Sequence, residues 1–96
     1  MFGRTKTATI EGQLTHEKLR AWLVAEVARM AKISEAEVDT SKSFDAYGID
    51  SRAAVQVSGA LETVVESRLS PAILFDHETI DDLAGYLTRE LRLQRA

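Results

Sequence analysis

The first regular hydrophobic pattern of the chain covers residues 16–31. Its apolar residues follow one another at steps of 3, 1, 4 and 3: Leu19, Trp22, Leu23, Val27 and Met30. These steps place all of them on one side of an α-helix of about four turns. Thr15 lies directly before the pattern, and its hydroxyl can accept a hydrogen bond from a free amide of the first turn. We therefore predict a helix over residues 16–31 with Thr15 as its N-cap.

The following segment, residues 33–50, has no comparable pattern. Ser34 and Glu37 have the spacing of a capping box, which predicts one short helical turn inside a long loop. Loops of more than about twelve residues in a small domain are usually functional or disordered. Three apolar residues interrupt this polar loop: Val38, Phe44 and Ile49. We expect them to hold the loop against the core, and they therefore favour an ordered loop.

A second helical pattern starts near Asp50 and Ser51 and extends to about Glu66. The residues expected to face the core have helical spacing: Ala54, Val57, Leu61, Val64 and Val65. Another stripe, at steps of 4, 3 and 4, is expected to face water or a partner: Val55, Gly59, Glu62 and Glu66. A glycine inside a helix costs ~1 kcal/mol relative to alanine. Gly59 therefore suggests either the close approach of another group or a tolerated imperfection of the helix, and the second is the commoner explanation.

A third long helix is predicted after Thr79, which is a suitable N-cap. Its apolar face is formed by residues at helical spacing: Ile80, Leu83, Ala84, Leu87 and Leu91. Between the second and third long helices, Ser70 and Pro71 are typical of a cap followed by proline at the first position of a short helix. No stretch shows the alternation of a strand. We predict an all-α fold, a small four-helix bundle with three main helices, one short helix and a long first connection.

The limits of this domain are predicted from the same pattern. Residues 14–93 form the folded domain, residues 1–13 a flexible N-terminal tail, and residues 94–96 a C-terminal tail.

Composition narrows the possible functions. The chain of 96 residues has a net charge of −3, whereas proteins that bind nucleic acids usually carry a basic face. No apolar run approaches the ~20 residues that cross a bilayer, and the first residues lack the apolar centre of a secretory signal. There is no cysteine, and His16 and His77 lie too far apart to suggest a metal pair. We expect a cytoplasmic monomer that binds neither membranes nor nucleic acid.

The stretch "FDAYGIDSRAAV", residues 44–55, places a serine where the second long helix begins. The first turn of a helix has unpaired backbone amides and partial positive charge, so a phosphate attached to Ser51 would be stabilised there. Gly48 can turn the chain sharply before the helix. Two other interpretations are open: Ser51 is a plain N-cap, or it is a hydrolase nucleophile paired with His77 and an aspartate. The second lacks the strand, turn and helix of a nucleophile elbow.

"GIDS" at the start of a helix, followed by Val55 and by "LE" at 61–62, resembles the phosphopantetheine attachment region of acyl carrier proteins. The preceding "VDTSKSFDAYGIDS" is similar to the approach loop of that family. The later "LSPAILFDHETIDDLAGYL" is similar to the closing segment of carriers of the polyketide-synthase type. The resemblance covers residues 14–90.

This resemblance implies a four-helix bundle in which Ser51 accepts 4'-phosphopantetheine from coenzyme A through a separate, magnesium-dependent phosphopantetheinyl transferase. It assigns Asp50 to the motif that the transferase recognises. The thiol of the attached arm would hold acyl intermediates as thioesters, which explains a carrier without cysteine. The chain would deliver these intermediates to a ketosynthase or other synthase domains for polyketide or lipid-type biosynthesis and would catalyse nothing itself.

The chain departs from the family pattern along the second long helix. Arg52 stands where the family usually has leucine, and Ala53 and Gln56 stand where fatty-acid-synthesis carriers place acids. "DSR" together with "LSP" is more similar to carriers that receive chains from fatty-acyl-AMP ligases. The residues that we assign to partner binding are Arg52, Val55, Gln56, Gly59 and Glu62.

Two alternatives to an acyl carrier stay open. A peptidyl carrier loaded with an amino acid often has histidine where this chain has Asp50. A helical interaction module would carry no prosthetic group.

Overall fold

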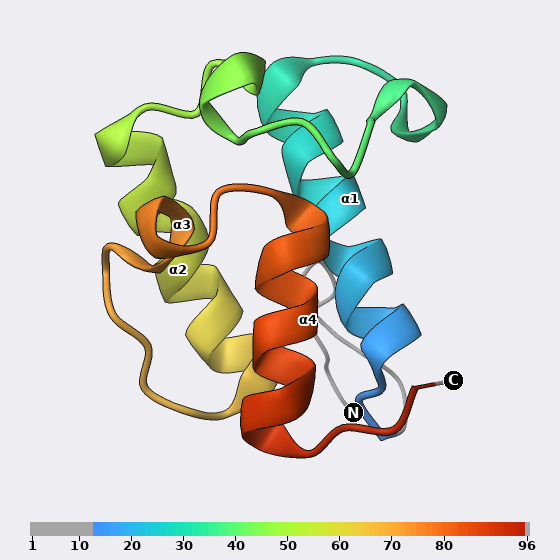
Figure 1. Ribbon diagram of the computed structural model, residues 1–96. Helices are drawn as coiled ribbons and strands as arrows, with labels where there is room; N and C mark the ends of the chain where they lie inside the picture. Colours follow the sequence, from blue (N-terminus) through green and yellow to red (C-terminus); the bar gives the residue numbers. More distant parts are fainter. Residues whose placement is uncertain (1–12, 96) are drawn as a thin grey trace, which may run out of the picture.

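The computed structural model describes residues 13–95, in which four helices follow one another along the chain. They are α1 (His16–Ala31), α2 (Ser51–Val65), α3 (Ile73–Asp76) and α4 (Ile80–Leu91), and two 3-10 turns, η1 (Glu35–Glu37) and η2 (Asp45–Tyr47), interrupt the first connection. Figure 1 shows α1 and α4 side by side, with α3 beside α2 and the long first connection crossing one end of the bundle. Residues 13–95 contain no strand, only two isolated bridges. The predicted all-α four-helix bundle is confirmed.

The helices begin where the local capping signals place them. The Thr15 hydroxyl accepts from the Lys18 amide at 3.2 Å, and the Thr79 hydroxyl accepts from the Asp82 amide at 3.0 Å. The predicted capping box of Ser34 and Glu37 is also formed. Each cap satisfies an amide that has no partner inside its own helix. Both long helices that start with a threonine cap therefore begin at the predicted residue.

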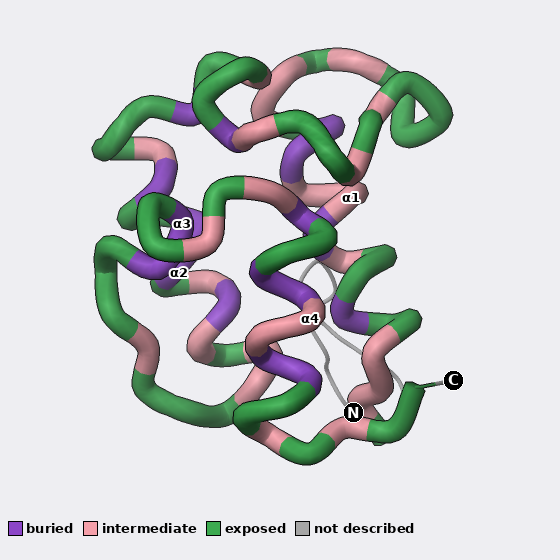
Figure 2. Tube along the Cα trace, in the orientation of Figure 1, coloured by how far each residue is buried: buried purple, intermediate pink, exposed green. Residues whose placement is uncertain are grey.

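The apolar faces of the helices meet in one core. Its buried apolar residues come from all four helices and from the first connection: Leu19, Leu23, Val27, Ala28, Phe44, Ile49, Ala54, Val57, Leu61, Ile73, Leu74, Ile80, Leu83, Ala84 and Leu87. Figure 2 shows these buried positions recurring along the three long helices, separated by exposed ones. Full burial of one such side chain contributes roughly 1.5–3 kcal/mol. The predicted core stripes are largely confirmed, although Trp22, Met30, Val64, Val65 and Leu91 are only half-buried.

Two polar residues in the core were not predicted. The buried Ser58 hydroxyl donates to the carbonyl of Val55 at 2.8 Å, and the buried Thr88 hydroxyl lies 2.8 Å from Nδ1 of His16. Among residues 13–95, no buried side-chain nitrogen or oxygen lacks a hydrogen-bond partner. Both hydroxyls are therefore accommodated without the penalty of an unpaired buried group.

The first connection is ordered by long-range contacts. Phe44 and Ile49 are buried, as predicted, and Val38 packs against the core. The amide of Asp81 in α4 donates to the carbonyl of Thr40 in the connection at 3.1 Å, and Arg20 contacts both of these residues. Arg20 of α1 donates to the hydroxyl of Thr40 at 3.0 Å, and its Nε lies 3.3 Å from the carboxylate of Asp81 in α4. Because the Arg20–Asp81 pair is about half exposed, it contributes at most ~1 kcal/mol, and apolar burial does most of the ordering.

One predicted helix start is wrong. Ser70 and Pro71 do not begin the short helix, because α3 starts at Ile73. The Ser70 hydroxyl accepts from the amide of Ala72 at 3.0 Å, and its carbonyl accepts from the amide of Ile73, also at 3.0 Å. These bonds close a turn ahead of the helix. The serine therefore stabilises the approach to α3 instead of capping it.

The predicted tails lie largely outside the part of the chain that the structure describes. Residues 1–12 and 96 are not described. At the other limit, the carbonyl of Gln94 accepts from the amide of His16 at 2.7 Å, and Thr15 and Gln94 form a parallel bridge. The segment after α4 is thus paired with the segment before α1, while the domain limits of 14 and 93 stay a prediction.

Candidate functional site

The candidate site is built on the first residues of α2. Asp50 is the N-cap, and its carboxylate accepts from the amide of Ala53 at 2.9 Å, while its carbonyl accepts from the amide of Ala54 at 2.8 Å. Ser51 is the first residue inside the helix. The interpretation of Ser51 as a plain N-cap is therefore wrong, because the neighbouring Asp50 is the N-cap. The serine hydroxyl is left available for other chemistry.

Ser51 is exposed, and its hydroxyl forms no hydrogen bond with any residue of the described chain. The amides of Ser51 and Arg52 also lack partners within residues 13–95. Unpaired amides and the aligned peptide dipoles make the start of a 15-residue helix favourable for negative charge. A phosphate ester on the Ser51 oxygen would lie beside these donors, so the residues present fit a phosphate-linked group.

The segment before α2 fixes the position of the serine. Gly48 ends the turn η2 with φ of +78°, a left-handed conformation that favours glycine. Ile49 follows directly and is buried in the core. A sharp turn and a buried side chain thus come directly before the N-cap of α2. The buried Ile49 side chain therefore anchors the backbone two residues before the exposed hydroxyl.

The residues assigned to partner binding have different environments. Arg52, Val55, Gln56 and Gly59 are all exposed, and half of the Val55 side chain is open to solvent. A Cβ atom added at Gly59 would meet nothing within 4 Å, so no part of the described chain requires glycine there.

Glu62 differs from that group. It is half-buried, and its carboxylate accepts from the amide of Leu69 at 2.8 Å. This bond holds the segment that leaves α2, a structural role that the sequence did not suggest. Partner binding by Glu62 stays a prediction.

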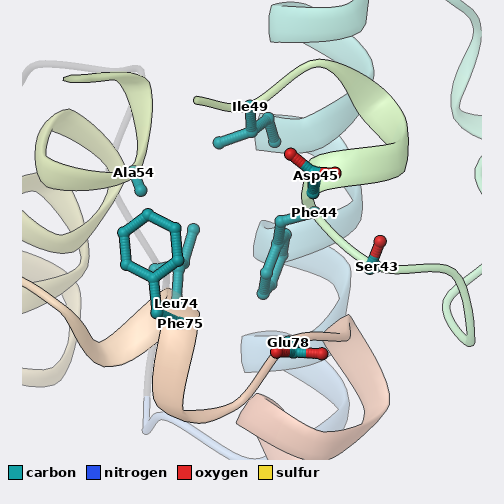
Figure 3. A pocket seen from close by; sticks show the side chains of 8 residues that line it. All are labelled: Ser43, Phe44, Asp45, Ile49, Ala54, Leu74, Phe75 and Glu78. Atoms are coloured by element: carbon teal, nitrogen blue, oxygen red, sulfur yellow. The ribbon is translucent and has the colours of Figure 1, made fainter. Parts of the chain in front are cut away.

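Sequence reasoning missed a cavity next to α2. It has a volume of about 350 Å³ and is lined by Ser43, Phe44, Asp45, Ile49, Ala54, Leu74, Phe75 and Glu78. Figure 3 shows Leu74 and Phe75 of α3 facing Phe44 across it. Phe75 is half exposed, which is unusual for a large aromatic side chain in this domain. The run "AILFD" gave the only signal, because its apolar residues exceed what one turn of helix can bury.

The two histidines lie in unrelated places. His77 stacks on Tyr86 with ring centroids 4.1 Å apart, and its Nδ1 lies 3.4 Å from the carboxylate of Asp82. His16 contacts Thr88 at the end of α4. In the described part of the chain, no group of three or more His, Cys, Asp or Glu side chains could hold a metal ion. Nor is any helix among residues 13–95 long and apolar enough to cross a membrane.

Comparison with known proteins agrees with this geometry. Residues 21–87 match the family described as "Phosphopantetheine attachment site". The chain is 35% identical over 81 residues to a phenolphthiocerol/phthiocerol polyketide synthase protein of Mycobacterium tuberculosis (strain CDC 1551 / Oshkosh), covering 84% of this chain and 4% of that protein. The chain spans only 1% to 4% of the length of the curated polyketide synthases that it matches.

Two solved structures share the fold. An acyl carrier protein from Anabaena sp. PCC 7120, Asl1650, has a TM-score of 0.77 and 26% identity, covering 93% of this chain and 99% of that chain. A free-standing peptidyl carrier protein from Acinetobacter baumannii has a TM-score of 0.74 and 35% identity, covering 80% of this chain and 96% of that chain.

These findings confirm the resemblance at the level of family, fold and cofactor. Carrier domains of this kind are not themselves catalytic; they present a covalently attached group to other enzymes. The chain belongs to the phosphopantetheine attachment-site family and is a carrier domain of the polyketide-synthase type, with 4'-phosphopantetheine as its covalent group.

Proposed function

We propose that Ser51 carries 4'-phosphopantetheine and that the chain holds acyl intermediates as thioesters on this arm for polyketide or lipid-type biosynthesis. The observation that carries the proposal is the exposed Ser51 hydroxyl without a hydrogen-bond partner, beside two unpaired amides at the start of α2. The family match spans this position. When bound, the arm supplies a thiol that forms the thioester.

The roles of the chain's own residues follow from their positions. The Ser51 oxygen forms the phosphate ester, and the amides of Ser51 and Arg52 face the negative charge of the phosphate. Asp50 caps the helix that positions the serine, and its carboxylate is also exposed to an approaching phosphopantetheinyl transferase. We assign transferase recognition to this carboxylate. Arg52, Val55, Gln56 and Gly59 form the exposed surface beside the arm that synthase enzymes, such as a ketosynthase, would contact.

Intact-mass spectrometry tests the attachment site. The purified chain is incubated with coenzyme A, Mg²⁺ and a phosphopantetheinyl transferase of broad specificity. The wild-type chain should gain one phosphopantetheine, and Ser51→Ala should gain none. Ser67→Ala is a matched control, because Ser67 is also exposed but lies after the end of α2. Addition of the arm to Ser51→Ala would place the attachment on another residue, and an unmodified wild type would favour a helical interaction module.

For the loading enzyme, we propose a fatty-acyl-AMP ligase. The support is the sequence "DSR" at 50–52 together with "LSP" at 69–71, and the absence of acids at Ala53 and Gln56 on the N-terminal half of α2. The competing function is a peptidyl carrier, which the 35% identity to the Acinetobacter baumannii structure favours. The phosphopantetheine-loaded chain is offered to fatty-acyl-AMP ligases and to amino-acid-activating enzymes, and the mass of the thioester decides. Exclusive loading with amino acids would overturn the acyl assignment.

A further inference from the structure

Arg52 is a cation without a partner at the start of α2. It is the second residue of that helix, and the next charged residue along the helix is Glu62. Arg52 is exposed, and its side chain forms no hydrogen bond or ion pair within residues 13–95. The nearest acid in the sequence is Asp50, whose carboxylate accepts from the amide of Ala53 instead. No acid in the described part of the chain therefore pairs with the positive charge of Arg52.

A cation at this position is unusual for a helix. The aligned peptide dipoles place partial positive charge at the first turn, where acids stabilise a helix and cations do not. The helix α4 follows this rule, with Asp81 and Asp82 in its first turn and Arg89 in its last. The first turn of α2 contains no acid and has Arg52 instead. Positions that break a local rule are often functional, and an anion beside Arg52 would explain the arginine.

The attached arm supplies such an anion. The family match over residues 21–87 implies the arm, and under the proposed attachment its phosphodiester lies on Ser51, directly before Arg52. Consecutive Cα atoms are about 3.8 Å apart, and the side chains of a helix lean toward its N-terminus. The two side chains diverge by about 100° around the helix axis, a gap that the long, flexible arginine can span. The planar guanidinium also matches two oxygens of a phosphate.

We propose that the guanidinium of Arg52 binds the phosphodiester of the arm and holds the base of the arm against the start of α2. The inference rests on the proposed attachment at Ser51. Before attachment, the cation lies beside the partial positive charge of the helix end. After attachment, the phosphate is attracted both by the cation and by the unpaired amides. Attachment therefore stabilises the domain, and Arg52 supplies part of that stabilisation.

NMR of the arm and of the arginine tests the contact. Wild type, Arg52→Gln and Arg68→Gln are loaded with phosphopantetheine, and intact mass verifies complete attachment. Arg68 is the matched control, because it is exposed, forms no ion pair within residues 13–95 and follows the end of α2. At mildly acidic pH, attachment to wild type should shift the side-chain Nε–H signal of Arg52 at least threefold more than that of Arg68. Arg52→Gln should move the ³¹P signal of the arm at least threefold more than Arg68→Gln.

The melting temperature measures how much the contact stabilises the domain. Attachment should raise it by about 4 °C in wild type and in Arg68→Gln, and at most half as much in Arg52→Gln. Arg52→Lys keeps the charge and should keep most of the gain. In 1 M NaCl, where the Debye length is about 3 Å, the difference between wild type and Arg52→Gln should fall at least twofold, because the pair is exposed.

Three results would overturn the proposal. The first is an Nε–H signal of Arg52 that does not move when the arm is attached. The second is an equal gain in melting temperature in wild type and Arg52→Gln. The third is a gain in Arg52→Lys as small as that in Arg52→Gln, because the charge would then play no part.

A chemical label separates this inference from the attachment at Ser51. The chain has no cysteine, so Ser51→Cys can be labelled at one place with an anionic 2-sulfonatoethyl or a neutral 2-hydroxyethyl methanethiosulfonate. The anionic label should shift the Nε–H signal of Arg52 at least threefold more than the neutral one. If it does but the wild type takes up no arm, the proposed attachment is wrong while the contact of Arg52 with an anion stands. If the arm is attached but neither the arm nor the anionic label shifts this signal, the attachment stands and the inference on Arg52 is wrong.

Discussion

Replacement of Asp50 separates the capping role that its carboxylate has at the start of α2 from the transferase recognition that we propose for it. Its 2.9 Å bond to the amide of Ala53 is the side-chain cap of that helix. Loss of such a cap costs about 1 kcal/mol, and loss of a negative charge near a helix N-terminus costs a further 0.3–1 kcal/mol or so. Asp50→Ala should therefore lower the free energy of unfolding by about 1.5 kcal/mol, which corresponds to a fall of roughly 6–12 °C in melting temperature for a domain of this size.

Asp50→Asn is the matched control, because asparagine caps helices about as well as aspartate and lacks only the charge. It should lose about 0.5 kcal/mol, or roughly 2–4 °C, when both variants are followed by circular dichroism at 222 nm. Equal losses in the two variants, or no loss in Asp50→Ala, would refute the account of Asp50 as a hydrogen-bonding cap.

The same pair of variants tests transferase recognition. If the enzyme recognises the carboxylate, Asp50→Asn should take up phosphopantetheine at least about tenfold more slowly although it folds almost as well as wild type, because a hydrogen bond to a charged group contributes about 1.5–3 kcal/mol. Modification rates measured by intact mass, at temperatures where both proteins are folded, give the comparison. A wild-type rate in Asp50→Asn would limit Asp50 to its structural role.

Three further predictions concern the fold. Gly59→Ala should stabilise the domain by about 0.5–1 kcal/mol, because the position is helical and open. Gly48→Ala should destabilise it by about 1 kcal/mol, because φ at Gly48 is +78°. Urea unfolding measures both free-energy changes, and changes of the same sign would contradict this account. Leu61→Ala removes a fully buried side chain from α2 and should cost about 2–5 kcal/mol in the same assay, and a loss below 1 kcal/mol would contradict its place in the core. Hydrogen bonds from the hydroxyl and then the amide of Ser41 lower the pKa of Asp39. The stabilisation of the fold by these bonds is complete above the ordinary pKa of an aspartate and is lost as the pH falls through the lower pKa of the folded state. Ser41→Ala should raise the pKa of Asp39 in an NMR titration, and an unchanged pKa would contradict this cause.

The helices could be predicted because their signals are local. Thr15 and Thr79 lie at the boundary of a clear apolar stripe, and the capping bond spans only three residues in each case. Ser70 carries the same signal, yet no long stripe follows it, and its hydroxyl closes a turn instead. The sequence alone allows Ser51 as the N-cap of α2, because serine and aspartate are equally good caps. Only the backbone geometry decides that Asp50 takes the position.

The surroundings of the site could not be predicted, because they depend on contacts between distant parts of the chain. The amide of Phe44 donates to the carbonyl of Glu78 at 2.8 Å, which brings the first connection to the segment between α3 and α4. That contact forms one side of the cavity, and the residues that it joins are far apart in sequence. The burial of Thr88 could not be predicted for a similar reason. Its hydroxyl is hydrogen-bonded to His16, which is distant in sequence, and a pattern of apolar residues does not include it.

The pairing of Thr15 with Gln94 has a mechanical consequence. The first and last residues that the structure describes therefore lie close together, and Figure 1 shows them at the end of the bundle away from the start of α2. A group attached to Ser51 would therefore lie at the opposite end of the domain from any segment that continues the chain.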